Sequence, residues 1–432
     1  MKFLYSDTQD YVDPRYDFLN DRLAPGRVRY WDDVYAHELL DTPPYDGLLI
    51  AMSAVRQADG VASSKVRYST AEEQRMLRVG ARKFLRLEGP DRDELMMMGD
   101  CGAFAYVEHP EPAYSPEEVV DFYLDGEFTH GVSPDHVIFE CDLKNPPAQE
   151  LPEAHRRYQI TLENAQKFID LVHREGNLFE PMGAVQGWSP ESMADAATSL
   201  VKMGYQYLAI GGLVPLKVDA IKVVLETIRK AIGPEPKMHL LGFAKADHIQ
   251  AFNDPRYGIT SFDSTSPLIR AFKDEKANYY LEKPGGGIEY YTAIRIPQAL
   301  ENSRLMQGIK RGLFSAEDLV RRERAALKAL RDFDQGRGSG DGALEAVMDY
   351  HQFLTLGNDE DSSVRTKELA KTSERVGRTL REKPWKQCGC AVCRDVGVEV
   401  IIFRASNRNK RRGFHNLSVY YSHLKHTMEK RA

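Results

Sequence analysis

Short apolar runs alternate with amphipathic stretches through the middle of this chain, a pattern that predicts a parallel sheet with helices packed outside it. Eight parallel strands would close a TIM-type (β/α)8 barrel, and we therefore predict the α/β fold class with that barrel. The runs with the length and composition of buried strands are Leu48–Ser53, Lys83–Gly89, Leu95–Asp100, His136–Asp142, Phe179–Gln186, Tyr207–Gly211, Met238–Gly242 and Ile259–Asp263.

Helix signals fall in several of the gaps between these runs. Ser189 before Pro190 supplies an N-cap and a proline at the first helical position, which predicts a helix that runs to about Met203. A second helix is predicted over Leu216–Ile232, before Gly233. One interval does not fit a barrel, because only five residues separate the second and third runs and a helical crossover needs more. Either an irregular connection occurs there or one strand is misassigned.

The alternating pattern ends near residue 300. We therefore predict a catalytic barrel domain at 1–300 and a helical extension at 301–432. Within the extension, Leu319–Phe333 has helical periodicity. Near the end of the chain, apolar residues again recur at helical spacing and predict a last helix: Leu417, Tyr420, Tyr421, Leu424 and Met428.

Composition and charge indicate an intracellular, cytoplasmic protein. The 432 residues are 42 % hydrophobic and 28 % charged, and no apolar run is long enough for a secretory signal or a membrane span. The net charge of −6 argues against a protein that coats nucleic acid over its whole surface, but basic residues gather at the end of the chain. A loop at 404–412 with Arg404, Arg408, Lys410, Arg411 and Arg412 suits a local phosphate contact, and a solvated tail is the alternative.

The cysteines are concentrated at one place. Cys388, Cys390 and Cys393 are three of only five in the chain, and His415 follows 22 residues after Cys393. Thiolate sulfur and imidazole nitrogen are the ligands of structural zinc, and a Cys3His set fills a tetrahedral shell without an open position for catalysis. We therefore predict a C-terminal helical zinc-binding segment with one structural Zn²⁺ per chain; a chance cluster or a redox motif is the alternative.

Candidate chemistry lies at the ends of the predicted strands, where a barrel gathers its functional side chains. Asp100, Asp142, Gln186 and Asp263 each end a strand, and a fifth strand ends in Gly211. Carboxylates that work without a metal suit glycosyl chemistry, in which one acid attacks the sugar carbon and another exchanges protons with the leaving group. Structural capping by aspartates is the simpler alternative.

Five motifs together resemble the base-exchanging tRNA-guanine transglycosylases. They are Met98-Gly-Asp100-Cys-Gly-Ala-Phe104, Cys141-Asp142-Leu-Lys-Asn-Pro-Pro147, Val185-Gln186-Gly187, Ile210-Gly-Gly-Leu-Val-Pro-Leu216 and Phe262-Asp263-Ser264. By this resemblance Asp263 is the nucleophile and Asp100 the general acid and base. The resemblance also implies that Asp142, Gln186, Gly211, Gly212, Leu213 and Val214 bind the base. Cys101 and Ala103 depart from the Ser and Gly of the family segment.

Two features are similar to the DNA-modifying branch, the DpdA-type transglycosylases, which replace guanine in DNA with 7-cyano-7-deazaguanine (preQ0). The opening segment Phe3–Pro14 resembles theirs. The loop after Gly212 lacks the Val-Gly-Glu with which bacterial queuosine enzymes accommodate an aminomethyl group. A nitrile only accepts hydrogen bonds, so a backbone N–H such as that of Val214 can serve it.

The resemblance implies base exchange in DNA, with preQ0 as the small-molecule substrate. The first alternative is the same exchange on tRNA, and the second is a non-catalytic zinc-containing subunit that only binds nucleic acid. The exchanged nucleotide would have to be flipped out or single-stranded, since C1′ is inaccessible inside a stack. An ATPase or another DNA-modification protein is a candidate partner for opening the duplex, and no membrane partner is expected.

Overall fold

The computed structural model describes residues 1–7, 9–243, 245–273, 276–356 and 362–429. Its contacts divide the chain into two units. The first consists of Met1–Gln9 and Tyr45–Ser266, and the second of Asp10–Pro44 and Pro267–Lys430. Residues 10–44 and 267–300, which the sequence analysis assigned to the catalytic domain, thus make their contacts within the second unit. The boundary at residue 300 stays a prediction for independently folding domains.

The first unit is a closed barrel of eight parallel strands, which confirms the predicted TIM-type fold. Around the barrel the neighbouring strands follow the order β1-β10-β9-β8-β7-β6-β5-β4. The strands are β1 (Lys2–Ser6), β4 (Gly47–Ala51), β5 (Met96–Asp100), β6 (His130–Val132), β7 (Glu180–Val185), β8 (Tyr207–Ile210), β9 (Lys237–Leu240) and β10 (Ile259–Asp263). Because β1 pairs with both β10 and β4, the N-terminal residues close the barrel.

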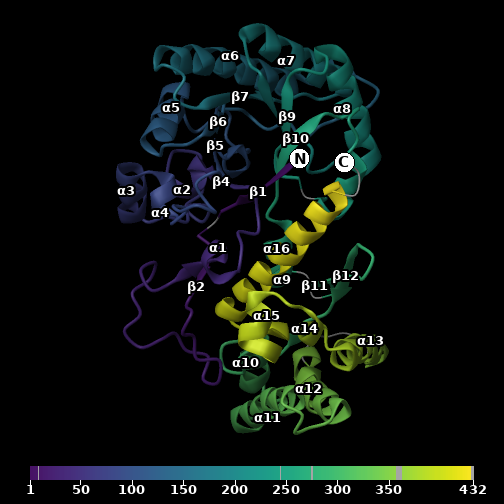
Figure 1. Cartoon of the computed structure of the whole chain (residues 1–432). Coiled ribbons are helices and arrows are strands. Elements are labelled where there is room, and N and C mark those ends of the chain that lie inside the picture. The colour runs from purple at the N-terminus through teal and green to yellow at the C-terminus, as the bar shows by residue number, and fades with distance from the viewer. Residues whose placement is uncertain (8, 244, 274–275, 357–361, 430–432) are drawn as a thin grey trace. The chain divides into compact units, whose positions relative to one another are not determined.

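Helices cover the outside of the barrel (Figure 1). They are α2 (Met52–Val55), α3 (Thr70–Val79), α4 (Ala81–Phe84), α5 (Pro116–Asp125), α6 (Pro152–Arg174), α7 (Pro190–Met203) and α8 (Val218–Ile232). The predicted boundaries of α7 are confirmed, since the Ser189 hydroxyl accepts a hydrogen bond from the Ser192 N–H and Gly204 ends the helix at a φ of 111°. The prediction for α8 is confirmed within two residues.

Two predicted strands are wrong. Lys83–Gly89 lies in α4 and the turns after it, and the missing strand is β1 at the N-terminus. This removes the five-residue interval that a barrel could not accommodate. The strand predicted at His136–Asp142 lies instead at His130–Val132. The true strand is only three residues long and contains Gly131, so its apolar signal is weaker than that of the buried segment after it.

Alternate residues of the strands fill the barrel interior, because successive side chains of a strand point to opposite faces. The buried cluster inside the barrel consists of Leu4, Leu49, Met96, Met98, Val132, Met182, Ala184, Tyr207 and Ala209. This packed core supports the strand ends at which the functional side chains lie.

The second unit is mainly helical. Its short strands are β2 (Tyr11–Val12), β3 (Val34–Tyr35), β11 (Tyr279–Glu282), β12 (Ile288–Tyr291), β13 (Ile294–Arg295) and β14 (Ile402–Phe403). Its helices are α1 (Ala36–Leu39), α9 (Ser266–Lys273), α10 (Ser303–Lys310), α11 (Ala316–Asp334), α12 (Gly340–Thr355), α13 (Ser362–Glu382), α14 (Pro384–Gln387), α15 (Ala391–Val396) and α16 (Ser406–Glu429). The predicted helix at Leu319–Phe333 is contained in α11.

The last helix, α16, is longer than predicted. It begins at Ser406 and therefore includes most of the segment that the sequence analysis took for a basic loop. Among the described helices, none combines the length and the apolar character that crossing a membrane requires.

Candidate active site and metal centre

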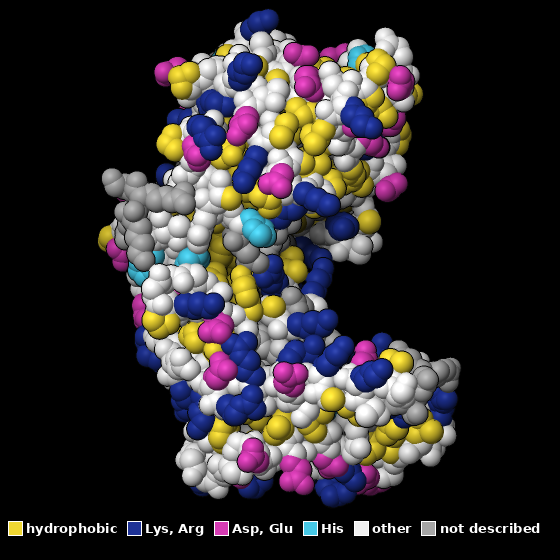
Figure 2. Space-filling view, turned by 90° about the vertical axis from the view of Figure 1, so that its right-hand side faces the viewer, with side chains coloured by type: hydrophobic (Ala, Val, Ile, Leu, Met, Phe, Trp, Pro, Cys, Tyr) yellow, Lys and Arg dark blue, Asp and Glu magenta, His cyan; other side chains and the backbone are white. Residues whose placement is uncertain are grey.

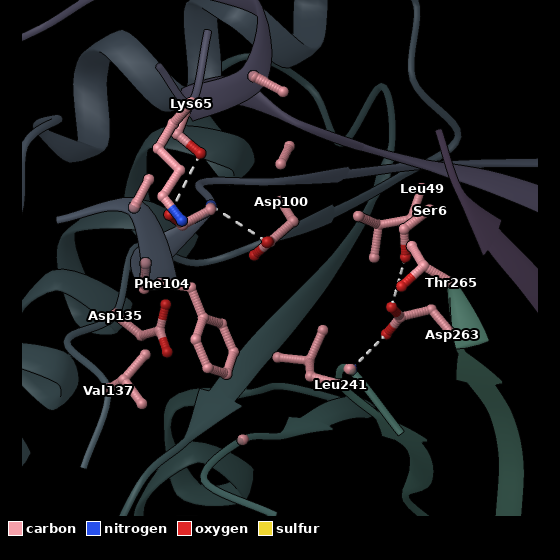
Figure 3. Close-up of a pocket in the computed structure, with 18 of the residues that line it drawn as sticks. Ser6, Leu49, Lys65, Asp100, Phe104, Asp135, Val137, Leu241, Asp263 and Thr265 are labelled. Atoms are coloured by element: carbon pink, nitrogen blue, oxygen red, sulfur yellow. Dashed lines mark hydrogen bonds between the residues drawn. The ribbon is translucent and has the colours of Figure 1, made fainter. Parts of the chain in front are cut away.

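A cavity of about 350 Å³ lies at the carboxyl ends of the barrel strands, and its volume is typical of small-molecule sites. Strands β1, β4, β5 and β10 contribute their last residues to the lining: Ser6, Ala51, Asp100 and Asp263. Figure 3 shows Asp263 and Ser6 on one side of the cavity and Asp100 and Asp135 on the other. The Phe104 ring, which is 48 % exposed, lies between Asp135 and Asp263 in this view.

The carboxylate of Asp263 is held by hydrogen bonds from three residues. The Ser6 hydroxyl donates to Oδ2 over 2.6 Å, and the Gly242 N–H donates to Oδ1 over 2.7 Å. His239 Nε2, on β9, lies 3.1 Å from Oδ1. Behind it, His239 Nδ1 lies 2.6 Å from the Ser261 hydroxyl. The orientation of Asp263 is therefore fixed before any ligand binds.

Asp100 lies in an environment that favours its protonated form. The Gly102 N–H donates to its Oδ2 over 3.1 Å. Burial in the pocket wall raises the pKa of Asp100 from 3.8 to about 7, and the negative charges of Asp135 and Asp263 contribute to the increase. A carboxyl group that titrates near neutrality can both donate and accept a proton.

Asp135 is a pocket residue that the sequence analysis missed. Its Oδ2 accepts a hydrogen bond from Gln186 Nε2 over 2.6 Å, and its Oδ1 accepts one from the Cys101 thiol over 3.2 Å. Burial raises the pKa of Asp135. It follows β6 by three residues, so the rule that polar residues end barrel strands would have found it if β6 had been placed at His130–Val132.

Asp142 does not reach the pocket. Its side chain is exposed, and Oδ1 accepts a hydrogen bond from the Lys144 N–H over 2.8 Å. Its own N–H donates to the Trp188 carbonyl over 2.8 Å. These contacts are those of a turn-forming aspartate. The structure thus brings Asp100, Gln186 and Asp263 together as predicted and leaves Asp142 outside.

Gly211 and Gly212 allow the backbone to approach Gln186. A Cβ on Gly211 would lie 2.2 Å from Gln186 Nε2, and one on Gly212 would lie 2.9 Å from the Ile138 carbonyl oxygen. Gly212 also has a φ of 69°, which favours glycine. Both glycines line the cavity. Leu213 is buried, and Val214 is partly exposed. A Cβ added to Gly242, which lines the cavity, would lie 3.7 Å from Val214 Cγ2.

The four predicted metal ligands converge in the second unit. The Sγ atoms of Cys388, Cys390 and Cys393 lie 3.5, 3.3 and 3.4 Å from His415 Nδ1. Tetrahedral zinc, with bonds of roughly 2.3 Å to sulfur and 2.0–2.1 Å to nitrogen, would separate such atoms by about 3.6 Å. The residues therefore fit a tetrahedral metal, and this cluster could hold one ion.

Neighbouring groups orient the ligands. His415 Nε2 lies 2.8 Å from the Tyr280 carbonyl oxygen, so Nε2 carries the hydrogen and Nδ1 is free to bind a metal. The Tyr279 ring stacks on His415 with a centroid distance of 4.0 Å, and its hydroxyl lies 3.2 Å from Cys393 Sγ. The ligand shell is thus tied to β11 and α16 at once.

The structure contradicts the predicted phosphate contacts of four arginines. Arg408 and Arg412 have 0 % exposure, and Arg404 and Arg411 are also buried. Their guanidinium groups are bound within the second unit by Asp21, Glu323, Asp395 and Glu399 or by backbone carbonyls. A phosphate cannot reach these buried guanidinium groups. Lys410 is partly exposed, and its phosphate contact stays a prediction.

Other cations of the second unit are exposed. Figure 2 shows Lys and Arg side chains on its visible face, with Asp and Glu between them. The error therefore concerns Arg404 and the buried arginines of α16, rather than basic surface in general.

No family model matches the chain. A curated relative, DNA-guanine transglycosylase from Salmonella montevideo, is 39 % identical over 434 residues, which cover 100 % of this chain and 98 % of the relative. This chain belongs to the DNA-guanine transglycosylase family. The resemblance drawn from the five motifs is thereby confirmed, and the chain is an enzyme of the guanine transglycosylase type.

Membership in the transglycosylase family gives the pocket a context. A base exchange needs a group that holds the sugar carbon, a group that moves a proton and a surface that recognises a base. The cavity contains an oriented carboxylate at Asp263, a carboxyl group with a pKa of about 7 at Asp100 and an amide–carboxylate pair at Gln186 and Asp135.

Proposed function

We propose that this chain replaces guanine in DNA with preQ0 through a covalent intermediate on Asp263. The observation that carries the proposal is the carboxylate of Asp263, which Ser6, Gly242 and His239 hold at the wall of a cavity that also contains Asp100. An oriented carboxylate facing a second, protonatable carboxyl group is the arrangement of a retaining glycosyl transfer.

In the first step an oxygen of Asp263 bonds to C1′ of the target nucleotide, and the bond between C1′ and N9 of guanine breaks. The electron pair of that bond leaves with guanine, and Asp100 donates the proton that neutralises it. Because the pKa of Asp100 is about 7, its protonated form is well populated at neutral pH. The products are a glycosyl ester on Asp263 and free guanine.

In the second step preQ0 takes the place of guanine. Asp100, now ionised, accepts a proton from the incoming base, whose N9 bonds to C1′ while the ester bond to Asp263 breaks. Two displacements at C1′ give net retention. The exchange balances without an oxidant or a reductant.

Base recognition is assigned to the opposite wall of the cavity. Asp135 takes the place that the sequence analysis gave to Asp142, since it lines the cavity and is paired with Gln186. Its carboxylate suits the N–H donors of a guanine edge, and Gly212 offers backbone beside them. The Val214 N–H is the proposed donor to the nitrile of preQ0, and the exposed Phe104 ring offers a stacking face.

We also propose that the metal held by Cys388, Cys390, Cys393 and His415 is zinc with a structural role. When bound, it supplies a fixed cross-link between the segment at 388–393 and α16. Elemental analysis is expected to find about one zinc per chain in the purified protein and none in the Cys390→Ser variant. The variant should also melt at a lower temperature. A protein that holds no zinc and melts unchanged after treatment with a chelator would contradict this assignment.

The decisive experiment offers labelled preQ0 with plasmid DNA, with single-stranded DNA and with a tRNA transcript, followed by nucleoside analysis. Label in DNA supports the proposal, whereas label only in tRNA would assign the chain to RNA. Label in single-stranded but not plasmid DNA would indicate that another protein opens the duplex. Exchange that persists in both Asp100→Asn and Asp263→Asn would remove both residues from the mechanism.

A further inference from the structure

Two cations line the active-site cavity and have no role in the chemistry proposed above. Lys65 and Arg67 belong to the segment between α2 and α3, and both border the cavity together with Asp100 and Asp263. Both residues are exposed. Within the described ranges neither side chain makes a hydrogen bond or an ion pair, so the positive charges are available to a ligand.

The backbone around these two residues is anchored. The N–H groups of Arg67 and Tyr68 donate to the Ala54 carbonyl over 2.7 and 3.2 Å, and the Lys65 N–H donates to Ala62 over 2.8 Å. The Tyr68 hydroxyl donates to Asp7 over 3.0 Å. These hydrogen bonds fix the backbone on both sides of Val66. Less conformational entropy is therefore lost when a ligand binds the two cations than if they lay on an unanchored loop.

Three acidic residues, Asp100, Asp135 and Asp263, line the rest of the cavity. A nucleotide bound there brings its base and C1′ to these residues, but its phosphates would be repelled by an ionised carboxylate such as that of the proposed nucleophile Asp263. The phosphates are joined to the sugar of the bound nucleotide, so they must lie close to the acidic residues without touching them. Of the lining residues, Lys65 and Arg67 are the cations.

We infer that Lys65 and Arg67 bind the DNA phosphodiester that adjoins the exchanged nucleotide. The inference rests on the proposed function, which places the sugar at Asp263. Arg67 can form paired hydrogen bonds with a phosphate, and Lys65 supplies a point charge. The two residues thereby take over the role that the sequence analysis assigned to the buried arginines at 404–412.

The test compares the double variant Lys65→Gln/Arg67→Gln with the matched control Lys167→Gln/Arg174→Gln. The control removes one lysine and one arginine that are exposed on α6 and do not line the cavity. Binding of a fluorescent single-stranded DNA oligonucleotide is measured by anisotropy over a series of salt concentrations. The cavity variant should bind about tenfold to a hundredfold more weakly, the range for hydrogen bonds to charged groups. Its salt dependence should fall by about 0.7 per lost phosphate contact.

Several results would overturn the inference. They are unchanged affinity and salt slope in the cavity variant, equal losses in the control, and no DNA binding by the wild-type protein. A loss confined to an RNA oligonucleotide of the same sequence would also overturn it. A Lys65→Arg variant, which keeps the charge, should bind as the wild type does.

Failure of the proposed function is visible separately. If the wild-type protein binds DNA through these residues but never incorporates labelled preQ0, the phosphate contact stands and the exchange reaction does not. If exchange occurs and the cavity variant keeps its affinity for DNA, the exchange reaction stands and the phosphate contact does not.

Discussion

The pocket carboxylates and the arginines near the start of α16 are both clusters of buried charge, but they are neutralised in opposite ways. Among the described residues, Asp100 and Asp135 have no cationic partner, and the pKa of each is raised by burial. Arg404 and Arg408, in contrast, share Asp21 and have a second carboxylate each. A fully paired buried charge destabilises the fold when its partner is removed, whereas a buried charge left unpaired shifts its pKa and is a candidate for chemistry.

Replacing the central pocket carboxylate should give the largest effect. The Asp263→Asn variant keeps the size of the side chain but loses the proposed nucleophile, and we expect base exchange to fall by about 10⁴-fold or more. The measurement is incorporation of labelled preQ0 into DNA, with thermal unfolding as a check of folding. Asp142→Asn is the matched control, because Asp142 is exposed and lies outside the cavity. An Asp263→Asn variant that kept wild-type exchange would remove the covalent mechanism.

Much of this site could be predicted from the sequence because its residues end strands with strong apolar patterns. Asp100 and Asp263 each follow a run of buried residues, and Gln186 follows β7 directly. The convergence of Cys388, Cys390, Cys393 and His415 could be predicted from residue type and spacing alone. Asp135 could not, since β6 is too short to be recognised beside the apolar segment that follows it.

Arg404 and the buried arginines of α16 show a different limit of sequence reasoning. A run of basic residues looks the same whether it is solvated or buried. Arg404 and Arg408 form ion pairs with Asp21 and Glu323, which lie far away in the sequence, and with the nearby Glu399. Only the tertiary structure shows that these carboxylates meet the guanidinium groups, so the charge pattern alone predicted the wrong role.

Removing one of the paired charges tests the other half of the comparison. In Arg408→Met the carboxylates of Asp21 and Glu399 lose a buried partner, which should lower the free energy of unfolding by about 3–5 kcal/mol. Chemical denaturation measures this change. Arg321→Met is the control, because Arg321 is exposed and its ion pair with Asp318 should contribute about 0–1 kcal/mol. Equal effects in the two variants would show that the α16 pairs contribute no more than surface charges.

A smaller effect is expected from the removal of a single hydrogen-bond donor to Asp263. Ser6→Ala removes the hydroxyl that donates to Asp263 Oδ2, and a hydrogen bond to a charged group contributes about 1.5–3 kcal/mol. We expect kcat/KM for exchange to fall roughly tenfold to a hundredfold, with little change in stability. Ser199→Ala is the control, because Ser199 is a partly exposed residue of α7 that does not line the cavity. Full activity in Ser6→Ala would mean that the remaining donors suffice to orient Asp263.

The smallest expected change is a displacement of the pH profile. In the proposed mechanism Asp100 acts as the acid in its protonated form, so exchange should decline as the pH rises above about 7. Asp135→Asn removes one of the negative charges that raise this pKa, after burial the next cause. The decline should therefore begin at lower pH in that variant, and it should be absent in Asp100→Asn.

The position of the decline, rather than the maximal rate, is the informative quantity, because Asp135 is also proposed to bind the base. The free energy of unfolding, like the rate of exchange, should fall as the pH rises. With a folded-state pKa of about 7, against 3.8 as the ordinary value, Asp100 stabilises the folded state below about pH 4 relative to higher pH. That contribution is lost as the pH rises toward 7. An unmoved decline in Asp135→Asn would show that burial alone sets the pKa of Asp100, and that the unpaired carboxylates do not act on one another.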